Sequence, residues 1–485
     1  FIMRHKKYHI LAVLIMAGLL AGPMAASVQA ESAERNLEWY TISLSNGDVI
    51  WENSEFPQSA TLVLRPGPQD MGGGVKAEIS QGGDPAVRIS SDKEIQLVTY
   101  SAIPDRRPTP LNSSLSVAGS EDGVKGYVVD APLSINVMTR GTEAASATNL
   151  HFAGVSVYVA DGDETRHPDV RLTLEKSLSV SIDGHQTDNP SKSTIYSRAV
   201  AGMDIMAEPG SVGSIIAKDK VSVRAYTAQP ERNAFGFRMV AGESKGNTGV
   251  EKLEFRKGAD FNAVVDSDGA AYGGRVINNS GRMEIRNASG ADLNINAEMN
   301  GNQMPGEEPS HGLFIYGDGS SNTALNLDGQ LNVRMDSEHE DAYGMSVTML
   351  DGGTMDGHVK EGQTVTADSD YNGVGHEART AEGLKLYVGG GSTLNYTVKN
   401  ARAAAAGAPD ATALILDTDG ATGTGTALHI VSGEVDMGKP STVSLTVKGA
   451  TEIKSTGGEK AEGIKSDTYN GATTRLEFDQ VTVTL

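Results

Sequence analysis

The sequence predicts an all-β protein: a right-handed parallel β-helix of about ten three-strand coils with an N-terminal β cap. Three observations support this prediction. A unit of about 37 residues repeats along the chain, short segments with alternating apolar residues recur within each unit, and turn-forming residues separate these segments. Repeats of this length are typical of solenoids, propellers and arrays.

The repeated unit opens with a glycine followed by a hydrophobic residue, any residue and a second hydrophobic residue. Copies begin at Gly126, Gly154, Gly202, Gly236, Gly273, Gly312, Gly344, Gly383 and Gly463, and Ala427 begins a further copy in the one long gap. Five copies also carry an alanine two residues earlier, at Ala234, Ala271, Ala342, Ala381 and Ala461. A corner between sheets often needs positive φ or close backbone approach, which glycine allows without strain.

Three strand-like segments follow one another within a unit. In the unit that begins at Gly273 they are residues 274–277, 283–286 and 293–296, and each alternates apolar with polar side chains. Gly, Asn, Asp and Ser lie between them, as expected at strand ends. Three strands of about five residues and three turns of 2–6 residues need roughly 21–33 positions. One unit therefore builds one coil, and surplus residues leave it as surface loops.

A β-propeller is the main alternative, because some blades repeat every 40–50 residues or so. Propeller blades need four antiparallel strands and usually carry aromatic motifs. Here the two tryptophans, Trp39 and Trp51, both precede the repeats, and aromatic residues make up only 5% of the chain. The β-helix is therefore favoured.

Residues 3–30 are predicted to be a secretory signal peptide. Arg4, Lys6 and Lys7 form its positive start, residues 10–20 its apolar core and residues 28–30 its cleavage site. The apolar run is about eleven residues long, too short for a permanent transmembrane helix, so an uncleaved anchor is the weaker alternative. We expect the mature chain to begin at Glu31.

Two further regions are predicted from the pattern that follows the signal peptide. Residues 31–120 are expected to form an N-terminal cap with irregular first coils, including a linker at Pro104–Pro110, and residues 121–485 the β-helix repeats. The polar segment from Met355 to Thr380 is expected to leave the coil as a long excursion. The last segment, residues 481–485, is strand-like and lacks a polar cap, so we expect the gene to continue past residue 485.

Charge and cysteine content limit the partners of this chain. Without residues 1–30 it would carry 38 basic and 62 acidic residues, a net charge of −24, which disfavours nucleic acid and anionic membranes. The chain has no Cys, so disulfides cannot stabilise it outside the cell. Its hydrophobic content of 38% is enough for a sizeable core.

The signal peptide, the Cys-free acidic composition and the repeated Ala-x-Gly-hydrophobic-x-hydrophobic units resemble the passenger region of type V autotransporters. The similarity is to pertactin-like and diffuse-adherence-adhesin-like passengers of Gram-negative bacteria, and it covers residues 31–485. In that family a C-terminal β-barrel of the same polypeptide carries the passenger across the outer membrane. The resemblance therefore implies that such a barrel follows in the full-length protein, since no barrel-like series of strands closes this sequence.

We predict no catalytic, metal-binding or cofactor-binding residues and no cofactor. No His-Glu-x-x-His helix and no Arg-Gly-Asp tripeptide is present. Ser90–Lys93 matches Ser-x-x-Lys only as a chance pattern, Gly317–Ser321 is interpreted as a turn, and His376 lacks a second histidine.

Acidic pairs spaced two residues apart raise the question of calcium binding. They are Asp161 with Asp163, Asp266 with Asp268, Asp368 with Asp370, and Asp417 with Asp419. Calcium takes six to eight oxygen ligands, and none of these pairs continues as an EF-hand loop. We therefore interpret them as solvated turns between strands.

These observations predict a non-enzymatic rod that acts in adhesion, aggregation or display. We expect export to the cell surface, the outer membrane or the medium, and partners among molecules of host or neighbouring cells, or further copies of the chain. The alternative is a secreted polysaccharide lyase or hydrolase, since such enzymes also use parallel β-helices. That alternative requires acidic residues and a basic residue that converge on one face of the helix.

Overall fold

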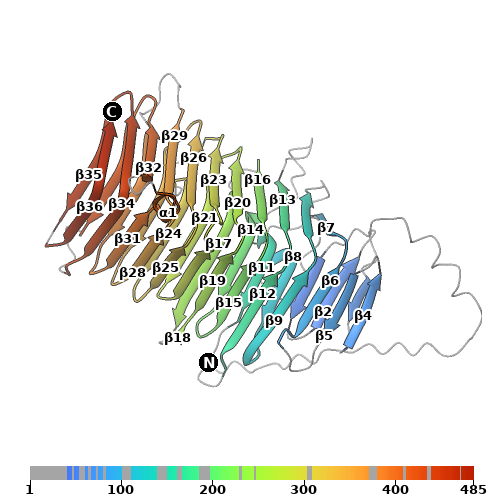
Figure 1. Ribbon diagram of the computed structural model, residues 1–485. Helices are drawn as coiled ribbons and strands as arrows, with labels where there is room; N and C mark the ends of the chain where they lie inside the picture. Colours follow the sequence, from blue (N-terminus) through green and yellow to red (C-terminus); the bar gives the residue numbers. More distant parts are fainter. Residues whose placement is uncertain are drawn as a thin grey trace, which may run out of the picture. The chain divides into compact units, whose positions relative to one another are not determined.

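The computed structural model shows a solenoid of stacked β-strand coils (Figure 1). It describes residues 41–45, 48–53, 60–63, 67–72, 75–79, 84–100, 111–138, 150–160, 166–184, 197–228, 232–244, 247–302, 309–370, 379–407, 411–433, 439–469 and 471–485. All of them belong to one compact unit, Glu38–Leu485. The predicted signal peptide and the predicted linker at Pro104–Pro110 lie outside the described residues.

One strand of each coil belongs to a column of parallel strands that we call the first column. It runs through β1 (Thr41–Ser45), β8 (Leu111–Gly119), β11 (Leu150–Val159), β14 (Ser197–Ala207), β17 (Asn233–Ser244), β21 (Ala271–Asn279), β24 (His311–Asp318), β27 (Ala342–Met349), β30 (Thr380–Val388), β33 (Thr424–Ser432) and β35 (Lys460–Thr468).

The other two strands of each coil form the second and third columns, which are joined in one 22-stranded sheet. The second column contains β6 (Val87–Ser91), β9 (Gly123–Asp130), β12 (Pro168–Leu174), β15 (Val212–Ala217), β19 (Val250–Phe255), β22 (Arg282–Asn287), β25 (Asn322–Leu327), β28 (Thr354–Val359) and β31 (Thr393–Lys399). The third contains β7 (Ile95–Tyr100), β10 (Leu133–Met138), β13 (Leu178–Gly184), β16 (Val221–Thr227), β20 (Ala259–Val265), β23 (Leu293–Met299), β26 (Leu331–Ser337), β29 (Gln363–Ser369) and β32 (Thr412–Asp419).

Two long strands turn the corner between these columns and belong to both. They are β34 (Thr442–Thr456), which pairs with β31 and with β32, and β36 (Thr473–Thr484), which pairs with both halves of β34. Within the described residues, ten coils therefore follow one another from β8 to β36, each pairing in parallel with its neighbours. This confirms the predicted parallel β-helix and its coil count.

The remaining elements interrupt this regular pattern. Near the N-terminus, β1 pairs antiparallel with β2 (Asp48–Asn53), which pairs with β3 (Ala60–Val63), while β4 (Gly67–Gly72), β5 (Val75–Ile79) and β6 form a second antiparallel group. A short strand, β18 (Asn247–Thr248), pairs with the end of β17, and the helix α1 (Ala401–Ala405) lies between β31 and β32. The division into signal peptide, cap and repeats stays a prediction.

Alternate side chains of the strands point inward and stack from coil to coil. In the first column the inward register runs through Leu115, Val155, Met203, Phe237, Gly274, Leu313, Met345, Leu384 and Leu428. Its apolar members are 0–1% exposed. Burying each large apolar side chain contributes roughly 1.5–3 kcal/mol before the entropy of ordering the chain is subtracted. The core is therefore one continuous apolar stack.

Glycine occurs in this stack where a neighbouring coil carries an aromatic ring. A Cβ at Gly274 would lie 2.4 Å from the ring of Phe237, and one at Gly357 would lie 2.2 Å from the ring of Tyr396. Both distances are far below van der Waals contact. Each of these glycines makes room for a ring on the adjacent coil.

Nine of the ten copies begin in the first column, eight of them at glycine and one at Ala427, and the copy at Gly126 was misplaced. Residues from Gly154 to Gly463 lie in first-column strands, but Gly126 lies in β9 of the second column and pairs with Arg171. On β8, Ser114 occupies the position of Gly154, because Ala153 pairs with Ser113 and Val155 pairs with Leu115. The apolar alternation is the same in all three columns, so the pattern alone did not identify the column.

The predicted excursion from Met355 to Thr380 is wrong for most of its length. Residues 354–359 and 363–369 form β28 and β29, which pair in register with the coils on both sides. Their outward side chains are polar, and Gly357 replaces a large apolar residue at an inward position, so the segment lacks a clear apolar signal in the sequence. Residues 371–378 lie outside the described residues.

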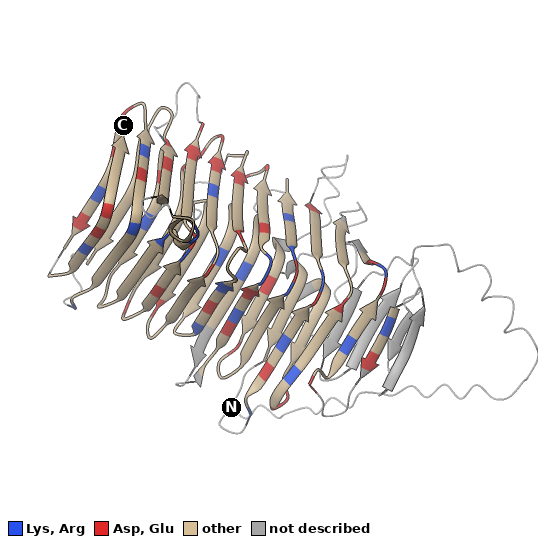
Figure 2. Ribbon diagram, in the orientation of Figure 1, with Lys and Arg blue, Asp and Glu red and all other residues tan. Residues whose placement is uncertain are grey.

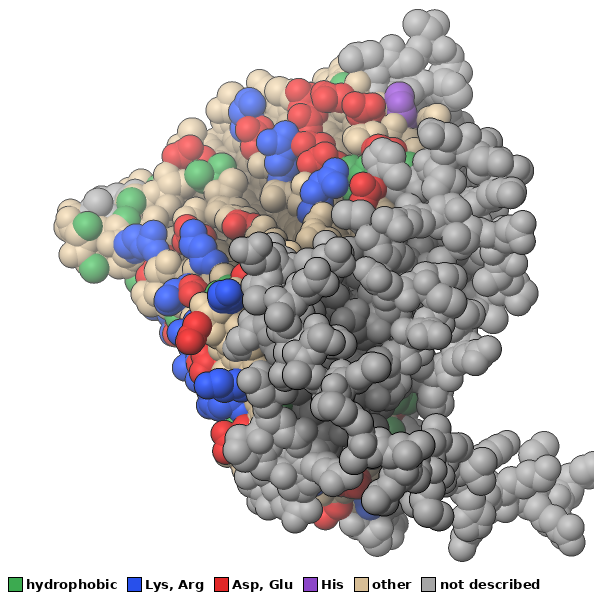
Figure 3. All heavy atoms as spheres, turned by 90° about the vertical axis from the view of Figure 1, so that its right-hand side faces the viewer, with side chains coloured by type: hydrophobic (Ala, Val, Ile, Leu, Met, Phe, Trp, Pro, Cys, Tyr) green, Lys and Arg blue, Asp and Glu red, His purple; other side chains and the backbone are tan. Residues whose placement is uncertain are grey.

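Charged residues of both signs are distributed along the strands and turns of the coils (Figure 2). Several ion pairs join neighbouring coils, among them Lys218 with Glu175 at 2.8 Å and Arg88 with Asp130 at 2.9 Å. On the described surface visible in Figure 3, basic and acidic side chains lie beside one another, with hydrophobic side chains scattered among them. The coils are thus linked by backbone pairing and by polar side-chain contacts.

Candidate functional site

The acidic pairs noted in the sequence have separate roles in the structure. Asp266 accepts hydrogen bonds from the hydroxyl of Tyr226 at 2.6 Å and from the amide of Asn300 at 2.7 Å. Asp417 pairs with Lys454 at 3.3 Å, and Asp419 accepts a hydrogen bond from the backbone N–H of Ala421 at 2.9 Å. Asp161, Asp163 and His376 lie outside the described residues. In the part of the chain that the structure describes, no group of three His, Cys, Asp or Glu could hold a metal ion.

The remaining sequence candidates are strand and turn residues. Ser90 lies in β6, and Lys93 follows that strand, its backbone N–H donating to the hydroxyl of Ser91 at 3.0 Å. Residues 317–321 close the turn from β24 to β25, where the N–H of Ser321 donates to the carbonyl of Asp318. The interpretation as a turn holds for residues 319–321, whereas residues 317 and 318 end β24.

Coil stacking brings acidic residues from different repeats into one line. Glu298, Asp336, Asp368 and Asp419 occupy the same register on β23, β26, β29 and β32. Burial, followed by the charges of Asp370, Asp336 and Asp419, raises the pKa of Asp368 to about 6. We call this line the carboxylate column. The sequence carried a partial signal for it, because Asp336 and Asp368 stand at the same offset from Gly312 and Gly344, the glycines that open their repeats.

A second charged group lies near the C-terminal end of the first column. Nδ1 of His429 on β33 lies 2.8 Å from Glu382 on β30, and Nε2 lies 3.1 Å from Asp467 on β35. Lys385 approaches Glu382 at 2.7 Å. Each ring nitrogen of His429 therefore faces a carboxylate oxygen at hydrogen-bond distance. We call these residues the histidine clamp, since it joins three successive coils.

The clamp shifts the pKa of both acids downward. Burial alone would raise the pKa of Glu382, but the hydrogen bond from His429 and the charge of Lys385 lower it overall. The hydrogen bond from His429 is the largest cause of the lowered pKa of Asp467. The two acids are thus held in the charged form by the groups they contact.

A ladder of aromatic rings precedes the clamp in the same column. Phe235, Tyr272, His311 and Tyr343 stack in register, with ring centroids 5.2, 5.8 and 5.0 Å apart. Nδ1 of His311 donates to the carbonyl of Pro309 at 2.7 Å, and burial lowers the pKa of His311 to about 3. His311 is therefore a neutral member of a packed stack.

Two buried carboxyl groups lie close to one arginine. Arg238 holds Asp204 through two nitrogens, the shorter contact being 2.7 Å, and both side chains are almost fully buried. Glu251 on β19 is fully buried and accepts a hydrogen bond from the N–H of Ala207 at 2.8 Å. Burial raises the pKa of Glu251 well above its ordinary value, and the charge of Asp204 adds to this effect. Burial therefore favours the protonated form of Glu251.

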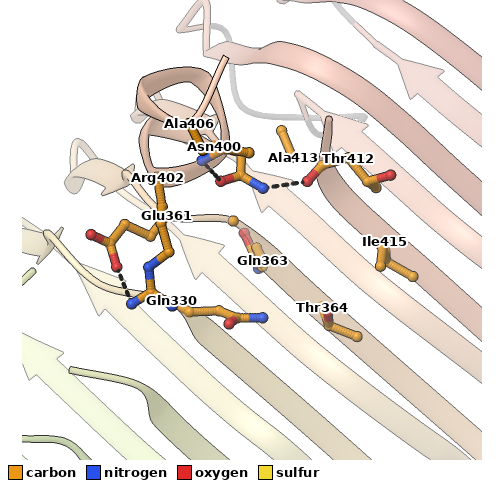
Figure 4. A pocket seen from close by; sticks show the side chains of 12 residues that line it. Gln330, Glu361, Gln363, Thr364, Asn400, Arg402, Ala406, Thr412, Ala413 and Ile415 are labelled. Carbon is orange, nitrogen blue, oxygen red and sulfur yellow. Dashed lines mark hydrogen bonds and ion pairs between the residues drawn. The ribbon is translucent and has the colours of Figure 1, made fainter. Parts of the chain in front are cut away.

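A pocket of about 360 Å³ lies beside α1 (Figure 4). Its lining comes from three coils and the helix, and consists of Gln330, Glu361, Gly362, Gln363, Thr364, Asn400, Arg402, Ala403, Ala406, Thr412, Ala413 and Ile415. The sequence analysis missed it. The available signal was the alanine-rich run at residues 401–406, which favours helix in a chain of strands.

Asn400 fixes the helix over the pocket. Its side-chain oxygen accepts a hydrogen bond from the N–H of Ala403 at 3.0 Å, as an N-cap does, and its amide nitrogen donates to the carbonyl of Thr412 at 2.8 Å. From the helix, Arg402 reaches Glu361 at 2.7 Å (Figure 4). Asn400 and Arg402 therefore hold α1 against the coils beneath it.

Glu361 is the acceptor at the centre of these contacts. It also accepts hydrogen bonds from the hydroxyl of Ser289 and from the N–H of Gly290, two coils away. Burial alone would raise its pKa, but these hydrogen bonds and the charge of Arg402 lower it. The two charged side chains of the pocket wall, Glu361 and Arg402, are thus paired with each other.

Among the described residues, no helix is long and apolar enough to span a bilayer. No protein-family model, no curated protein and no solved structure matches this chain.

Proposed function

We propose that this chain is the exported passenger of an autotransporter and acts as a non-enzymatic, adhesive rod at the cell surface. The observation that supports it most directly is the stack of ten coils, each joined to the next by the same backbone pairing. A repetitive scaffold of this kind presents side chains along its length and suits display and contact. The signal peptide predicted for residues 3–30 supports export.

Surface exposure can be tested on intact bacteria that carry the natural gene. We expect externally added protease or antibody to reach the passenger without lysis, and the mature chain to begin at Glu31 by N-terminal sequencing. Deleting the gene is expected to reduce aggregation or attachment to host cells, and the plasmid-borne gene to restore it. A chain that stays inside unlysed cells would contradict the proposal.

The alternative, a polysaccharide lyase or hydrolase, is favoured by one observation. The histidine clamp gathers two carboxylates, a histidine and Lys385 on one face, which is the kind of convergence such an enzyme needs. However, the side chains of Glu382 and His429 are each only 10% exposed, and both ring nitrogens are engaged. These features favour a structural clamp.

An activity assay separates the two candidates. Purified protein is incubated with polygalacturonate and other polysaccharides, and the release of reducing or unsaturated ends is followed. We expect no turnover above that of the His429→Ala variant. Turnover that this substitution abolishes in a folded protein would establish the enzyme instead.

A further inference from the structure

The pocket beside α1 has the size and position of a binding site. At about 360 Å³ it falls near the lower end of the roughly 300–1,000 Å³ that is typical of small-molecule pockets. Its floor is formed by Thr364 and Ile415, which pair in register on the outer face of β29 and β32, and α1 forms its wall. It is therefore large enough for one compact chemical unit.

We propose that this pocket binds a neutral sugar unit of a glycan. The first reason is its charge balance. The cation that lines it, Arg402, is already matched by Glu361 at 2.7 Å, and Glu361 is also bonded to Ser289 and Gly290. A charged ligand would have to break this pair and leave one partner without its counter-charge, which is costly. A ligand without charge avoids that cost.

The second reason is the mixture of groups that line the pocket. The amides of Gln330 and Asn400 and the hydroxyls of Thr364 and Thr412 offer uncharged donors and acceptors, and every amide or hydroxyl oxygen has two lone pairs. Between them lie the aliphatic side chains of Ala403, Ala406, Ala413 and Ile415. A sugar ring presents hydroxyls at its edge and C–H groups on its faces, so it matches both kinds of surface.

The third reason is that the polar groups are held in place before any ligand arrives. Gln330 donates to Asn332 at 3.0 Å, Asn332 donates to Asn294 at 2.7 Å, and Asn294 donates to Asp260 at 2.6 Å. This chain of side-chain hydrogen bonds crosses three coils and orients the amide of Gln330. Asn400 is likewise fixed by Ala403 and Thr412. Fixed donors reduce the entropy lost on binding.

The inference goes beyond the proposed function and does not depend on it, because it is tested with the purified full chain in solution. The probes are maltotriose, cellotriose and triacetylchitotriose, with trigalacturonic acid and trialanine as the charged and peptide comparators. Binding is measured by isothermal titration calorimetry and by saturation-transfer-difference NMR. We expect at least one neutral trisaccharide to bind and both comparators to fail.

The location is tested by filling the pocket. Thr364→Tyr places a ring in the floor, at an outward position that leaves the core unchanged, and is expected to weaken binding at least about tenfold. Thr397→Tyr is the matched control, because Thr397 is also a partly exposed strand threonine facing outward, on β31, but does not line the pocket. It is expected to bind like the wild type.

Three results would overturn the inference: none of the neutral trisaccharides binds, a comparator binds as well as they do, or the Thr364→Tyr protein binds them unchanged. Circular dichroism and thermal unfolding of both variants establish that they are folded. A second variant, Gln330→Ala, removes one polar group without adding bulk, and it is expected to weaken binding in the same assay. Surface display on intact cells is a separate readout, so failure of either proposal is distinguishable from failure of the other.

Discussion

At the scale of single residues, the repeated glycine is explained by close approach between coils. A Cβ at Gly236 would lie 2.3 Å from the carbonyl oxygen of Gly273, and one at Gly312 would lie 2.6 Å from that of Gly344. None of these glycines has positive φ. Of the two reasons for glycine that the sequence left open, the structure therefore selects close backbone approach.

Replacing one of these glycines is expected to destabilise the protein. In Gly312→Ala the new Cβ meets backbone oxygen, which cannot turn aside as a side chain does, so the free energy of unfolding should fall by about 1–3 kcal/mol. Gly213→Ala is the control, because its nearest neighbour would be a methyl group at 3.3 Å. Urea unfolding measures both, and equal losses in the two variants would contradict the explanation.

The buried carboxyl of Glu251 gives a prediction on pH. Its pKa is raised in the folded state, so the folded chain keeps a proton that the unfolded chain releases above about pH 4.5. The stability linked to this group is complete below that pH and declines as pH rises toward the folded pKa. Glu251→Gln keeps the oxygen that accepts from Ala207 and removes the titration.

We therefore expect Glu251→Gln to be at least as stable as the wild type near neutral pH, with the difference disappearing near pH 4. Chemical denaturation at the two pH values gives the comparison. A variant that is clearly less stable than the wild type at neutral pH would show that Glu251 is needed in its charged form. The sequence analysis missed this group, although Glu251 stands in phase with the inward Leu253 and Phe255 of the same strand.

At the scale of elements, sequence periodicity was sufficient to predict three strands per coil, but neither their column nor their insertions. The segments predicted at residues 283–286 and 293–296 lie within β22 and β23. Gly126 was assigned to the wrong column because strands in all columns alternate in the same way. The pocket depends on how α1 folds back over β29 and β32, and a three-dimensional contact of this kind leaves no periodic trace.

The histidine clamp supplies the prediction that belongs to this scale. His429→Ala removes the contacts of the ring with Glu382 and Asp467 and leaves these two side chains facing each other across β33, so the free energy of unfolding should fall by about 1–3 kcal/mol. His358→Ala, at an exposed strand position on β28, is the matched control and should change little.

The pH dependence of the clamp has the opposite sign to that of Glu251. The pKa values of Glu382 and Asp467 are lowered in the folded state, so their stabilisation is present above the unfolded values near pH 4 and is lost as pH falls through the folded ones. Thermal unfolding of wild type and His429→Ala should therefore converge in acid. If the difference in unfolding temperature between wild type and His429→Ala stayed constant down to low pH, the stabilisation by the clamp would not depend on these charges.

At the scale of the whole molecule, stability is a sum over contacts between adjacent coils. Middle coils are covered on both sides, whereas Val483 of β36 and Leu485, which follows that strand, are 46% and 68% exposed. We expect amide hydrogen exchange to be slowest in β20, β23 and β26 and faster in β35 and β36. Exchange followed by mass spectrometry tests this, and uniform protection along the chain would contradict a sum of local contacts.

The glycine-to-carbonyl contact between coils has a consequence for how such a chain can change. The junctions from Gly154 to Ala427 share this contact, so gaining or losing one complete unit among them leaves each remaining junction as it was. Gene duplication can therefore lengthen or shorten the molecule in fixed increments without redesigning its interior. The length of the stack of coils can therefore change in evolution independently of the side chains that its surface displays.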